Sequence, residues 1–453
     1  MSNILAKYNI PVPRYTSYPP ANYFSETFTA ADYEKALTAS NHNKPSHISF
    51  YIHIPFCRHL CNYCGCNSFA MTGKEKIKQY LNAVNNEISY VTSFLDPERK
   101  ITQIHYGGGT PTIIPAQELA KINSRLLSSF QQIEKPEIAI ECHPAYLSIS
   151  DWRELLNAGF NRFSIGVQDF NEKVLKAVNR RPPNMPLQTI LSLLKKQNAG
   201  VNLDLLYGLP LQTVNSFAQT VRQAADLNPD RIVTFSYAHV PWINNRQLML
   251  EKIGLPAEKD KTDMYRITGE ILSAAGYKPV GLDHFVKTTD ELYQALKNKQ
   301  LHRNFQGYCT RRTTGQVYAF GVSAISQLSC AYAQNSKDIN QYILKTNTGA
   351  ATVKGYSLSK EEQVTRTVIE TLMCNLCIDF DELSNATGLP AETIKTTVNF
   401  NTERFAEFAN DEIITLTENS IEITPKGRLF VRNVAATFDK LQTTTNRKFS
   451  KPV

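Results

Sequence analysis

Strand-like and helix-like segments alternate over more than half of this sequence, and this alternation most constrains its fold. From about residue 48 to residue 290, short runs rich in β-branched and aromatic residues are separated by helical stretches. Such alternation is typical of parallel strands joined by crossover helices. The predicted strands are 48–55, 103–108, 137–142, 162–167, 202–208 and 231–237, and the helices between them include 75–94, 116–130, 186–198 and 214–227. The pattern predicts an α/β fold, an incomplete (β/α)6 barrel with its chemistry at the carboxyl ends of the strands.

The pattern changes on both sides of the barrel region. We expect an N-terminal flap segment, the barrel, a barrel extension with a substrate-side connection, and a mainly helical C-terminal domain, over residues 1–45, 46–290, 291–357 and 358–453. In the last region a helix at 359–376 is followed by Asp379 and Asp381, both typical of a helix start. The run IITLTENSIEIT then predicts two short strands about a turn, followed by another helix. Helices with a hairpin wing resemble a winged-helix module.

Composition and charge restrict the cellular compartment and the binding partners that we expect for this protein. No segment approaches the roughly 18 apolar residues that a membrane-spanning helix needs, and the N-terminus lacks the pattern of a secretory signal, so we expect a cytoplasmic protein with no membrane contact. The net charge of +8 permits acidic partners, but on its own it does not predict nucleic-acid binding. Nine cysteines, four of them between residues 57 and 66, suit a metal site in a reducing compartment better than a disulfide framework.

The cysteine-rich segment directly follows the first predicted strand. Cys57, Cys61 and Cys64 have the spacing C-x3-C-x2-C, and thiolates select iron–sulfur clusters or zinc. Structural zinc usually pairs two separate cysteine knuckles, and no convincing second knuckle is present. Ordinary electron-transfer clusters use four cysteines, so three would leave one iron open. The spacing is the signature of the radical S-adenosylmethionine superfamily, and we predict that these three cysteines hold a [4Fe–4S] cluster whose open iron binds S-adenosylmethionine.

Cys66 lies only two residues beyond this triad. It offers a possible fourth ligand, which would close the site. We interpret it instead as a buried thiol that supports the loop.

Further polar and glycine residues fall at the ends of later strands. The motif HYGGGTP places Gly107, Gly108 and Gly109 at the end of the second strand, where glycines allow backbone to approach a ligand closely. Side chains that would converge on a nucleoside and an amino acid follow at or just beyond later strand ends: Glu141, Gln168, Arg180 and Asp204.

These motifs together resemble one family. YIHIPFC with the cysteines after it, HYGGGTP, GVQDF, DLLYGLP, HRNFQGY, GVSAIS and the early PRYTSYP are similar to the oxygen-independent coproporphyrinogen III oxidases, also called coproporphyrinogen dehydrogenases, from about residue 8 to residue 445. The resemblance implies an oxidoreductase of haem (porphyrin) biosynthesis. It would convert the ring A and B propionates of coproporphyrinogen III into vinyl groups by means of a 5′-deoxyadenosyl radical, giving protoporphyrinogen IX.

The resemblance also implies the site. No catalytic residue is expected beyond the cofactor radical, and two S-adenosylmethionine molecules would bind at Tyr51, Tyr63, Gly108, Gly109, Thr110, Glu141, Gln168, Arg180, Asp204, Ala238 and Ile325. The partners would be coproporphyrinogen III and an electron donor such as flavodoxin or ferredoxin, and we expect a monomer. Arginine forks suit a tetracarboxylate substrate, and the candidates are Arg14, Arg162, Arg303, Arg311 and Arg312. Tyr15 and Tyr18 would lie over the macrocycle as part of the flap.

The sequence departs from the family pattern at three places. Cys142-His143 stands where Val-Asp is common, Arg181-Pro182-Pro183 replaces a polar stretch, and Cys309 and Cys377 occupy positions where other residues are expected. The His143 departure leaves open a related haem-degrading radical methyltransferase or a diverged paralogue without activity. Haem chaperones share the cluster loop and are a further alternative. The winged-helix-like end and the positive charge leave open a metal-bearing DNA-binding protein.

Overall fold

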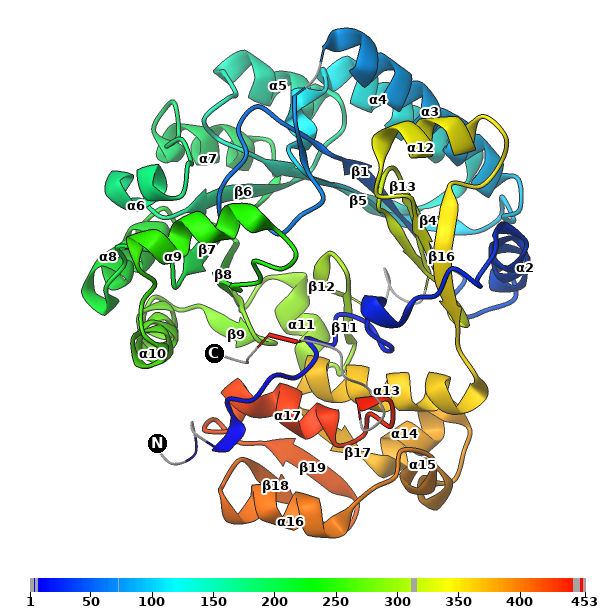
Figure 1. Ribbon diagram of the computed structural model, residues 1–453, viewed down its shortest axis with the longest axis vertical. Helices are drawn as coiled ribbons and strands as arrows, with labels where there is room; N and C mark the ends of the chain where they lie inside the picture. The colour runs from blue at the N-terminus through cyan, green and yellow to red at the C-terminus, as the bar shows by residue number, and fades with distance from the viewer. Residues whose placement is uncertain (1–3, 5–6, 72, 311–315, 443–448, 451–453) are drawn as a thin grey trace.

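The computed structural model describes residues 4, 7–71, 73–310, 316–442 and 449–450. Its centre is a twelve-stranded sheet that curls into an open barrel (Figure 1). The strands lie side by side in the order β16 (Thr352–Ser357), β15 (Ala331–Asn335), β14 (Ile325–Gln327), β13 (Val317–Phe320), β1 (Ile48–Ile54), β4 (Lys100–Gly108), β5 (Gln131–Cys142), β6 (Arg162–Gln168), β7 (Gly200–Tyr207), β8 (Arg231–Ser236), β10 (His284–Val286) and β9 (Lys278–Val280).

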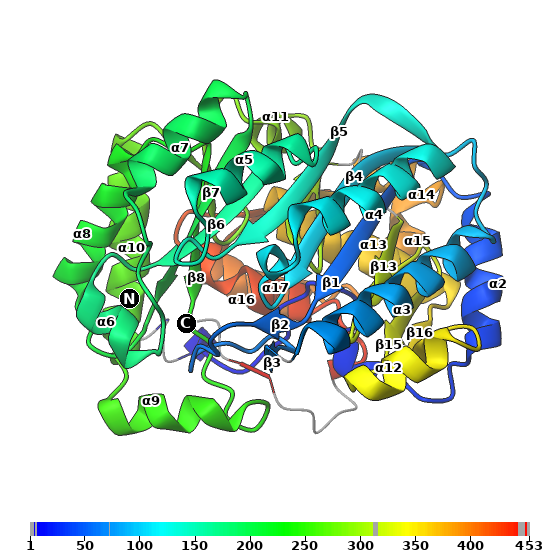
Figure 2. The ribbon, with the colours of Figure 1, turned by 90° about the horizontal axis from the view of Figure 1, so that it is seen from above.

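All neighbouring strands from β13 to β8 pair in parallel, and those outside this run pair antiparallel. The six strands predicted from the alternation are β1 and β4 to β8, each found within a few residues of its expected bounds. The crossover helices cover the outer face of the sheet (Figures 1 and 2). They are α3 (Lys74–Thr92), α4 (Ala116–Ser129), α5 (Ile149–Asn157), α6 (Glu172–Ala177), α7 (Leu187–Lys196) and α8 (Val214–Asp226). The incomplete barrel is therefore confirmed.

Residues after β8 add to the barrel without continuing its repeat. They form α9 (Leu248–Ile253), α10 (Glu258–Ala274), α11 (Glu291–Lys297), the hairpin of β11 (Leu301–Asn304) and β12 (Gly307–Thr310), and α12 (Ile339–Thr346). β13 then pairs in parallel with β1, on the side of the barrel away from β8. A barrel extension was predicted for residues 291–357, but the pairing of β13 with β1 was not, because it joins segments more than 260 residues apart.

The C-terminal part forms a second packed unit below the barrel in Figure 1. It contains a three-stranded sheet and helices: α13 (Lys360–Asn375), β17 (Cys377–Asp379), α14 (Phe380–Thr387), α15 (Ala391–Thr397), α16 (Thr402–Asn410), β18 (Ile414–Leu416), β19 (Ser420–Ile423) and α17 (Val431–Ala436). Asp379 caps α14 by accepting hydrogen bonds from the backbone of Asp381 and Glu382. The predicted helices and hairpin are therefore present.

The N-terminal segment corrects one expectation. Tyr15 and Tyr18 are 3% and 1% exposed and pack in the apolar core of the C-terminal unit. The Tyr15 hydroxyl donates a hydrogen bond to Asp439 at 3.0 Å, and Asn433 donates to the carbonyl of Tyr8 at 2.9 Å. Both rings are therefore packed inside this core, so the structure does not show them in their predicted place over a macrocycle. A short helix, α2 (Ala30–Ser40), follows and packs on β15 and β16.

Within the described residues, every helix is too short or too polar to cross a membrane.

Candidate active site

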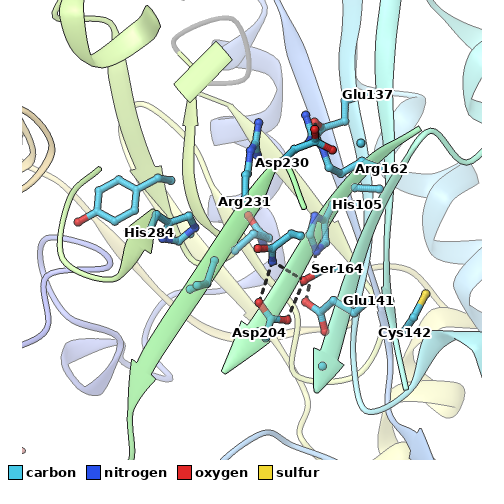
Figure 3. A pocket seen from close by; sticks show the side chains of 18 of the residues that line it. His105, Glu137, Glu141, Cys142, Arg162, Ser164, Asp204, Asp230, Arg231 and His284 are labelled. Carbon is cyan, nitrogen blue, oxygen red and sulfur yellow. Dashed lines mark hydrogen bonds and ion pairs between the residues drawn. The ribbon is translucent and has the colours of Figure 1, made fainter. Parts of the chain in front are cut away.

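A cavity of about 1170 Å³ runs along the inner face of the barrel. One end is lined by Cys57, Cys61, Cys64 and Cys66. The other end is lined by charged residues from the starts of the strands, such as Arg162 and Arg231 (Figure 3). The cysteine end lies at the carboxyl ends of the parallel strands, where the fold predicts the chemistry.

The loop that carries the cysteines, residues 57–68, is anchored from two sides. On one side the backbone N–H of Asn62 donates to the carbonyl of Val178 at 3.0 Å, and the side chain of Asn179 donates to Leu60 at 2.9 Å. On the other side Asn244 donates to the carbonyl of Cys64 at 2.7 Å, and Gln247 donates to that of Tyr63 at 2.9 Å. These amides could not be predicted, because single Asn and Gln residues far along the chain give no local signal of the loop they hold.

The three predicted ligand thiols all line this cavity, and hydrogen-bond donors face them. Thr110 donates to the sulfur of Cys57 at 3.5 Å, and Arg180 donates to that of Cys61 at 3.6 Å. The pKa of Cys64 is lowered to about 6, first by a hydrogen bond from Cys66. Donors of this kind stabilise thiolates, the form that binds iron. Together with the open cavity beside them, they fit a cluster held by three cysteines.

Within the described ranges, no set of three or more His, Cys, Asp or Glu side chains surrounds a single-ion site. A [4Fe–4S] cluster instead requires each thiolate to bind a different iron, so its ligands stand around a larger object. The assignment of Cys57, Cys61 and Cys64 as cluster ligands stays a prediction.

Cys66 differs from its predicted role. Cys66 is exposed and lines the cavity, and it is not buried beneath the loop. Its thiol hydrogen-bonds to Cys64, and this contact is the first cause of a raised Cys66 pKa. Cys66 therefore supports the loop through its neighbour's thiol and not by filling a buried gap.

The glycine motif brings the end of β4 against the start of the cysteine loop. The backbone N–H of Gly109 donates to Ile54 at 2.8 Å, and that of Thr110 donates to Phe56 at 2.9 Å. A Cβ on Gly109 would lie 2.8 Å from the carbonyl oxygen of Phe56, and Gly108 has a φ of +114°. The absence of a side chain at Gly109 therefore allows the backbone at the end of β4 to pack closely against the backbone of Pro55 and Phe56.

Polar side chains predicted at the strand ends do converge on the cavity. Asp204 accepts hydrogen bonds from Ser164 and Asn202, each at 2.7 Å (Figure 3), and burial raises its pKa. Glu141 accepts from the backbone N–H of Gly108 at 3.2 Å. The predicted cofactor-binding residues that line the cavity are Tyr63, Gly108, Gly109, Thr110, Glu141, Gln168, Arg180 and Asp204.

Gln168 reaches this group through a backbone irregularity. A register shift between β6 and β7 falls at Gly166 and Gln168, and Gln168 has a φ of +71°. Bulges of this kind turn a side chain to a new direction and are frequent beside active sites.

Three predicted cofactor residues are not among those that line the cavity. Tyr51 lies behind Gly107, where a Cβ would lie 3.0 Å from its ring. Ile325 packs against the apolar cluster around Phe24 and Tyr332, and Ala238 lies just beyond β8. A cofactor role for these three stays a prediction.

The candidate substrate arginines separate into different environments. Arg162 lines the far end of the cavity, but its guanidinium is paired with Glu137 at 2.9 Å. Arg303 is buried outside the cavity lining and donates to the backbone of Arg14 at 3.0 Å. Arg311 and Arg312 lie outside the described residues.

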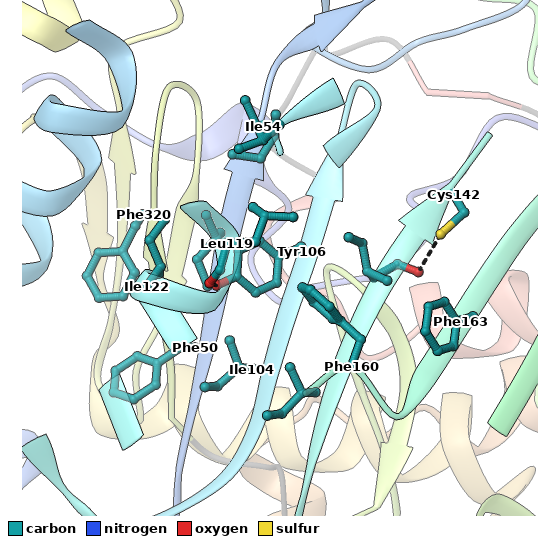
Figure 4. Close-up of a cluster of buried hydrophobic side chains, with 14 of the residues drawn as sticks. Phe50, Ile54, Ile104, Tyr106, Leu119, Ile122, Cys142, Phe160, Phe163 and Phe320 are labelled. Carbon is teal, nitrogen blue, oxygen red and sulfur yellow. Dashed lines mark hydrogen bonds between the residues drawn. The ribbon is translucent and has the colours of Figure 1, made fainter. Parts of the chain in front are cut away.

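The departures from the family pattern are accommodated locally. Cys142 is 5% exposed and packs in the apolar core behind the sheet (Figure 4). His143 lies against Tyr146 with ring centroids 4.6 Å apart, and burial lowers its pKa to about 2, so it is neutral. Tyr146 and Arg181 both hydrogen-bond to His59 in the cysteine loop, at 2.9 and 3.1 Å. His143 and Arg181 thus belong to one contact network against that loop.

Comparisons with known proteins agree with this geometry. Residues 51–224 match the radical SAM superfamily, and residues 358–430 match the HemN C-terminal domain. The oxygen-independent coproporphyrinogen III oxidase of Synechocystis sp. is 36% identical over 97% of this chain and 94% of its own length. The enzyme of that name from Escherichia coli is 38% identical over 96% of this chain and 94% of its own.

A solved structure of the coproporphyrinogen III oxidase HemN from Escherichia coli, described as a radical SAM enzyme, superposes with a TM-score of 0.89. It covers 97% of this chain and 98% of its own at 36% identity. The match spans the barrel, the cysteine loop and the C-terminal unit together, so the chain belongs to the oxygen-independent coproporphyrinogen III oxidase family.

Proposed function

We propose that this chain converts coproporphyrinogen III to protoporphyrinogen IX by oxidative decarboxylation of two propionates, in haem biosynthesis. The observation that carries the proposal is the anchored loop whose three thiols open into the 1170 Å³ cavity. Pockets for drug-sized ligands usually measure about 300–1,000 Å³, so this cavity exceeds the usual pocket of a single small ligand. The full-length similarity to coproporphyrinogen III oxidases supports the same substrate.

Membership of the radical SAM superfamily implies a [4Fe–4S] cluster and S-adenosylmethionine. Cys57, Cys61 and Cys64 would hold the cluster. When bound, these groups supply the 5′-deoxyadenosyl radical that removes a hydrogen atom from each propionate, which is chemistry of the cofactor and not of a protein side chain.

The side chains of the protein then have holding and orienting roles. Thr110 and Arg180 donate to the ligand sulfurs. Glu141 and Asp204 present carboxylate oxygens toward the same space, where they suit the ammonium and hydroxyl groups of the nucleoside amino acid. Tyr63 is fixed by a hydrogen bond from Arg180 at 3.0 Å.

The finer parts of the proposal concern stoichiometry and partners. Two S-adenosylmethionine molecules would bind, as the family resemblance implies. We further propose a monomer in the cytoplasm that receives electrons from a flavodoxin or ferredoxin.

The test is anaerobic reconstitution with iron and sulfide, followed by incubation with dithionite, S-adenosylmethionine and coproporphyrinogen III. Product fluorescence after oxidation and 5′-deoxyadenosine are measured together. We expect both products, and neither from a Cys61→Ala variant. Formation of 5′-deoxyadenosine without any vinyl product would reject the substrate, and a methylated or ring-opened tetrapyrrole would identify a haem-degrading relative instead.

A further inference from the structure

One short segment of the chain concentrates exposed apolar side chains. Of the ten large hydrophobic residues that stand exposed in the described ranges, five lie within residues 242–253, with 43% to 67% of their surface accessible. We call this set the α9 patch: Trp242, Ile243, Leu248, Met249 and Ile253. Exposed apolar clusters usually mark an interaction surface. None of the five lines the barrel cavity, so the patch is not explained by substrate binding there.

The other side of the same segment contacts the cysteine loop. Asn244 and Gln247, which hold the carbonyls of Cys64 and Tyr63, lie between the patch residues in sequence. Leu250 of α9 is fully buried, in a small apolar cluster against which Tyr63 packs. The α9 patch is therefore the outer surface of the support that holds two residues of the loop. Figure 2 shows α9 at the edge of the molecule, at the end where β2 (Phe56–Cys57) and β3 (Phe69–Ala70) lie.

The surroundings of the loop on its other side are basic. α6 joins the same small apolar cluster through Val174, and Asn179 just beyond it anchors Leu60. The exposed charged residues of the loop, of α6 with the turn after it, and of α9 are five basic and two acidic: Arg58, Lys173, Lys176, Arg181 and Lys252 against Glu172 and Glu251. We call the five basic residues the basic rim. A partner that is complementary to the α9 patch and to this rim would carry acidic residues around an apolar centre.

From this juxtaposition we propose that the α9 patch docks a small acidic one-electron carrier protein, which delivers electrons to the group held by the cysteine loop. The inference rests on the proposed function, which requires an external electron. At this surface the carrier is oxidised by one electron and the loop's prosthetic group is reduced by that same electron, with no bond formed or broken. The apolar side chains supply the binding contact, and the basic rim steers the acidic carrier toward it.

Binding to flavodoxin tests the proposal directly. Isothermal titration of the full chain with flavodoxin is compared for wild type and an Ile243→Ser/Met249→Gln double variant. Because a few central apolar residues dominate such interfaces, we expect the Kd for flavodoxin to be about tenfold or more higher in the variant than in wild type. Because salt screens the attraction between the basic rim and an acidic carrier, we also expect the Kd to rise with salt concentration. The matched control is Leu344→Ser, which removes a 68% exposed leucine from α12, on the opposite side of the molecule in Figures 1 and 2. Equal affinity in the double variant and wild type would overturn the proposal.

A second measurement separates docking from catalysis. S-adenosylmethionine cleavage by reconstituted enzyme is followed with reduced flavodoxin and, separately, with dithionite. We expect a raised apparent KM for flavodoxin in the double variant and an unchanged rate with dithionite. An equal loss with both reductants would overturn the proposal, because the patch would then serve the reaction site itself. A wild-type enzyme inactive even with dithionite would reject the proposed function instead.

Two other partners for the α9 patch, a second copy of the chain and a lipid surface, would each give a different experimental result. A dimer of the native chain that sedimentation shows to dissociate in the double variant would identify a second copy as the partner. Retention on anionic phospholipid vesicles that the double variant loses would identify a lipid surface. Either result would overturn docking of an electron carrier.

Discussion

Glu87 shows how much a single buried side chain depends on its surroundings. It lies on α3 with 2% of its surface exposed and accepts hydrogen bonds from Gly321, Asn335 and Tyr342 at 2.6 to 2.8 Å. Burial raises its pKa from 4.5 to about 7. A carboxyl group with a raised folded-state pKa contributes most to stability when protonated, below pH 4.5, and this contribution is lost as pH rises through about 7.

A Glu87→Gln variant removes this titration. We expect wild type to lose stability relative to the variant between pH 5 and pH 8, by on the order of 3 kcal/mol. Urea denaturation across this pH range measures the difference. Glu75→Gln on the exposed first turn of the same helix is the control and should show no such trend. A pH-independent difference between wild type and Glu87→Gln would contradict the assignment.

Gly109 permits the contact between β4 and the cysteine loop. A Gly109→Ala substitution would place its Cβ 2.8 Å from backbone atoms of Pro55 and Phe56, which have no free side chain to move aside. Overpacking of this kind costs about 1–3 kcal/mol, and here it would displace the residue directly before Cys57. We expect iron and sulfide content after reconstitution to fall several-fold.

Gly65 provides the matched control for Gly109. It lies in the cysteine loop itself, yet an added Cβ would meet no atom within 4 Å. Gly65→Ala should keep a wild-type iron content. Equal iron loading in both variants would show that the contact at Gly109 does not shape the loop.

At the scale of elements, a charge network joins α11 to the far end of the barrel. Arg231 at the start of β8 pairs with Asp290 at 2.8 Å and with Glu291 at 3.1 Å, and Arg162 of β6 pairs with Glu137 and approaches Asp290 at 4.0 Å. These side chains are mostly buried, so each charge depends on its partners. The network fixes the N-terminal end of α11 across the open side of the sheet.

Removal of one partner tests the network. Arg231→Met leaves Asp290, whose side chain is 4% exposed, without its nearest cation, and we expect the free energy of unfolding to fall by about 3 kcal/mol. Lys259→Met breaks the exposed pair with Asp263 on α10 and should leave stability nearly unchanged, because water screens such a pair. Chemical denaturation of both variants measures the difference, and similar small effects would mean that the buried network adds little.

Local patterns predicted some elements better than others, for physical reasons. β1 and β4 to β8 each carry β-branched, leucine or aromatic residues that the core buries, and this composition can be seen in the sequence alone. β13 and the burial of Tyr15 arise only from contacts between distant parts of the chain. The cysteine spacing predicted the loop, but its anchors Asn244 and Asn179 became visible only when α6 and the residues before α9 were placed around it.

At the scale of the whole molecule, the chain's first residues complete the C-terminal unit. Tyr8 is 1% exposed and stacks on Phe408 with ring centroids 5.1 Å apart, about 400 residues further along the chain. Tyr15 and Tyr18 join the same core. The two ends of the sequence therefore fold as one unit and are not independent appendages of the barrel.

Loss of Tyr8 tests this joint folding. Tyr8→Ala should destabilise the C-terminal unit by about 3–5 kcal/mol, as removal of a buried aromatic ring usually does. Limited proteolysis should then cleave within residues 358–442 faster than in wild type. Ile10→Ala, which changes an exposed residue of the same segment, is the control. Unchanged cleavage in Tyr8→Ala would mean that the C-terminal unit folds without the N-terminal segment.

The most direct test of the account is spectroscopy of the reconstituted, ⁵⁷Fe-enriched protein with and without S-adenosylmethionine. Three cysteine ligands from one loop predict a cluster with one chemically distinct iron. Its Mössbauer signal should change when S-adenosylmethionine is added, and labelled amino nitrogen should show magnetic coupling to the reduced cluster. Four equivalent thiolate-bound irons, with Cys66 as the fourth ligand and no response to S-adenosylmethionine, would contradict the account.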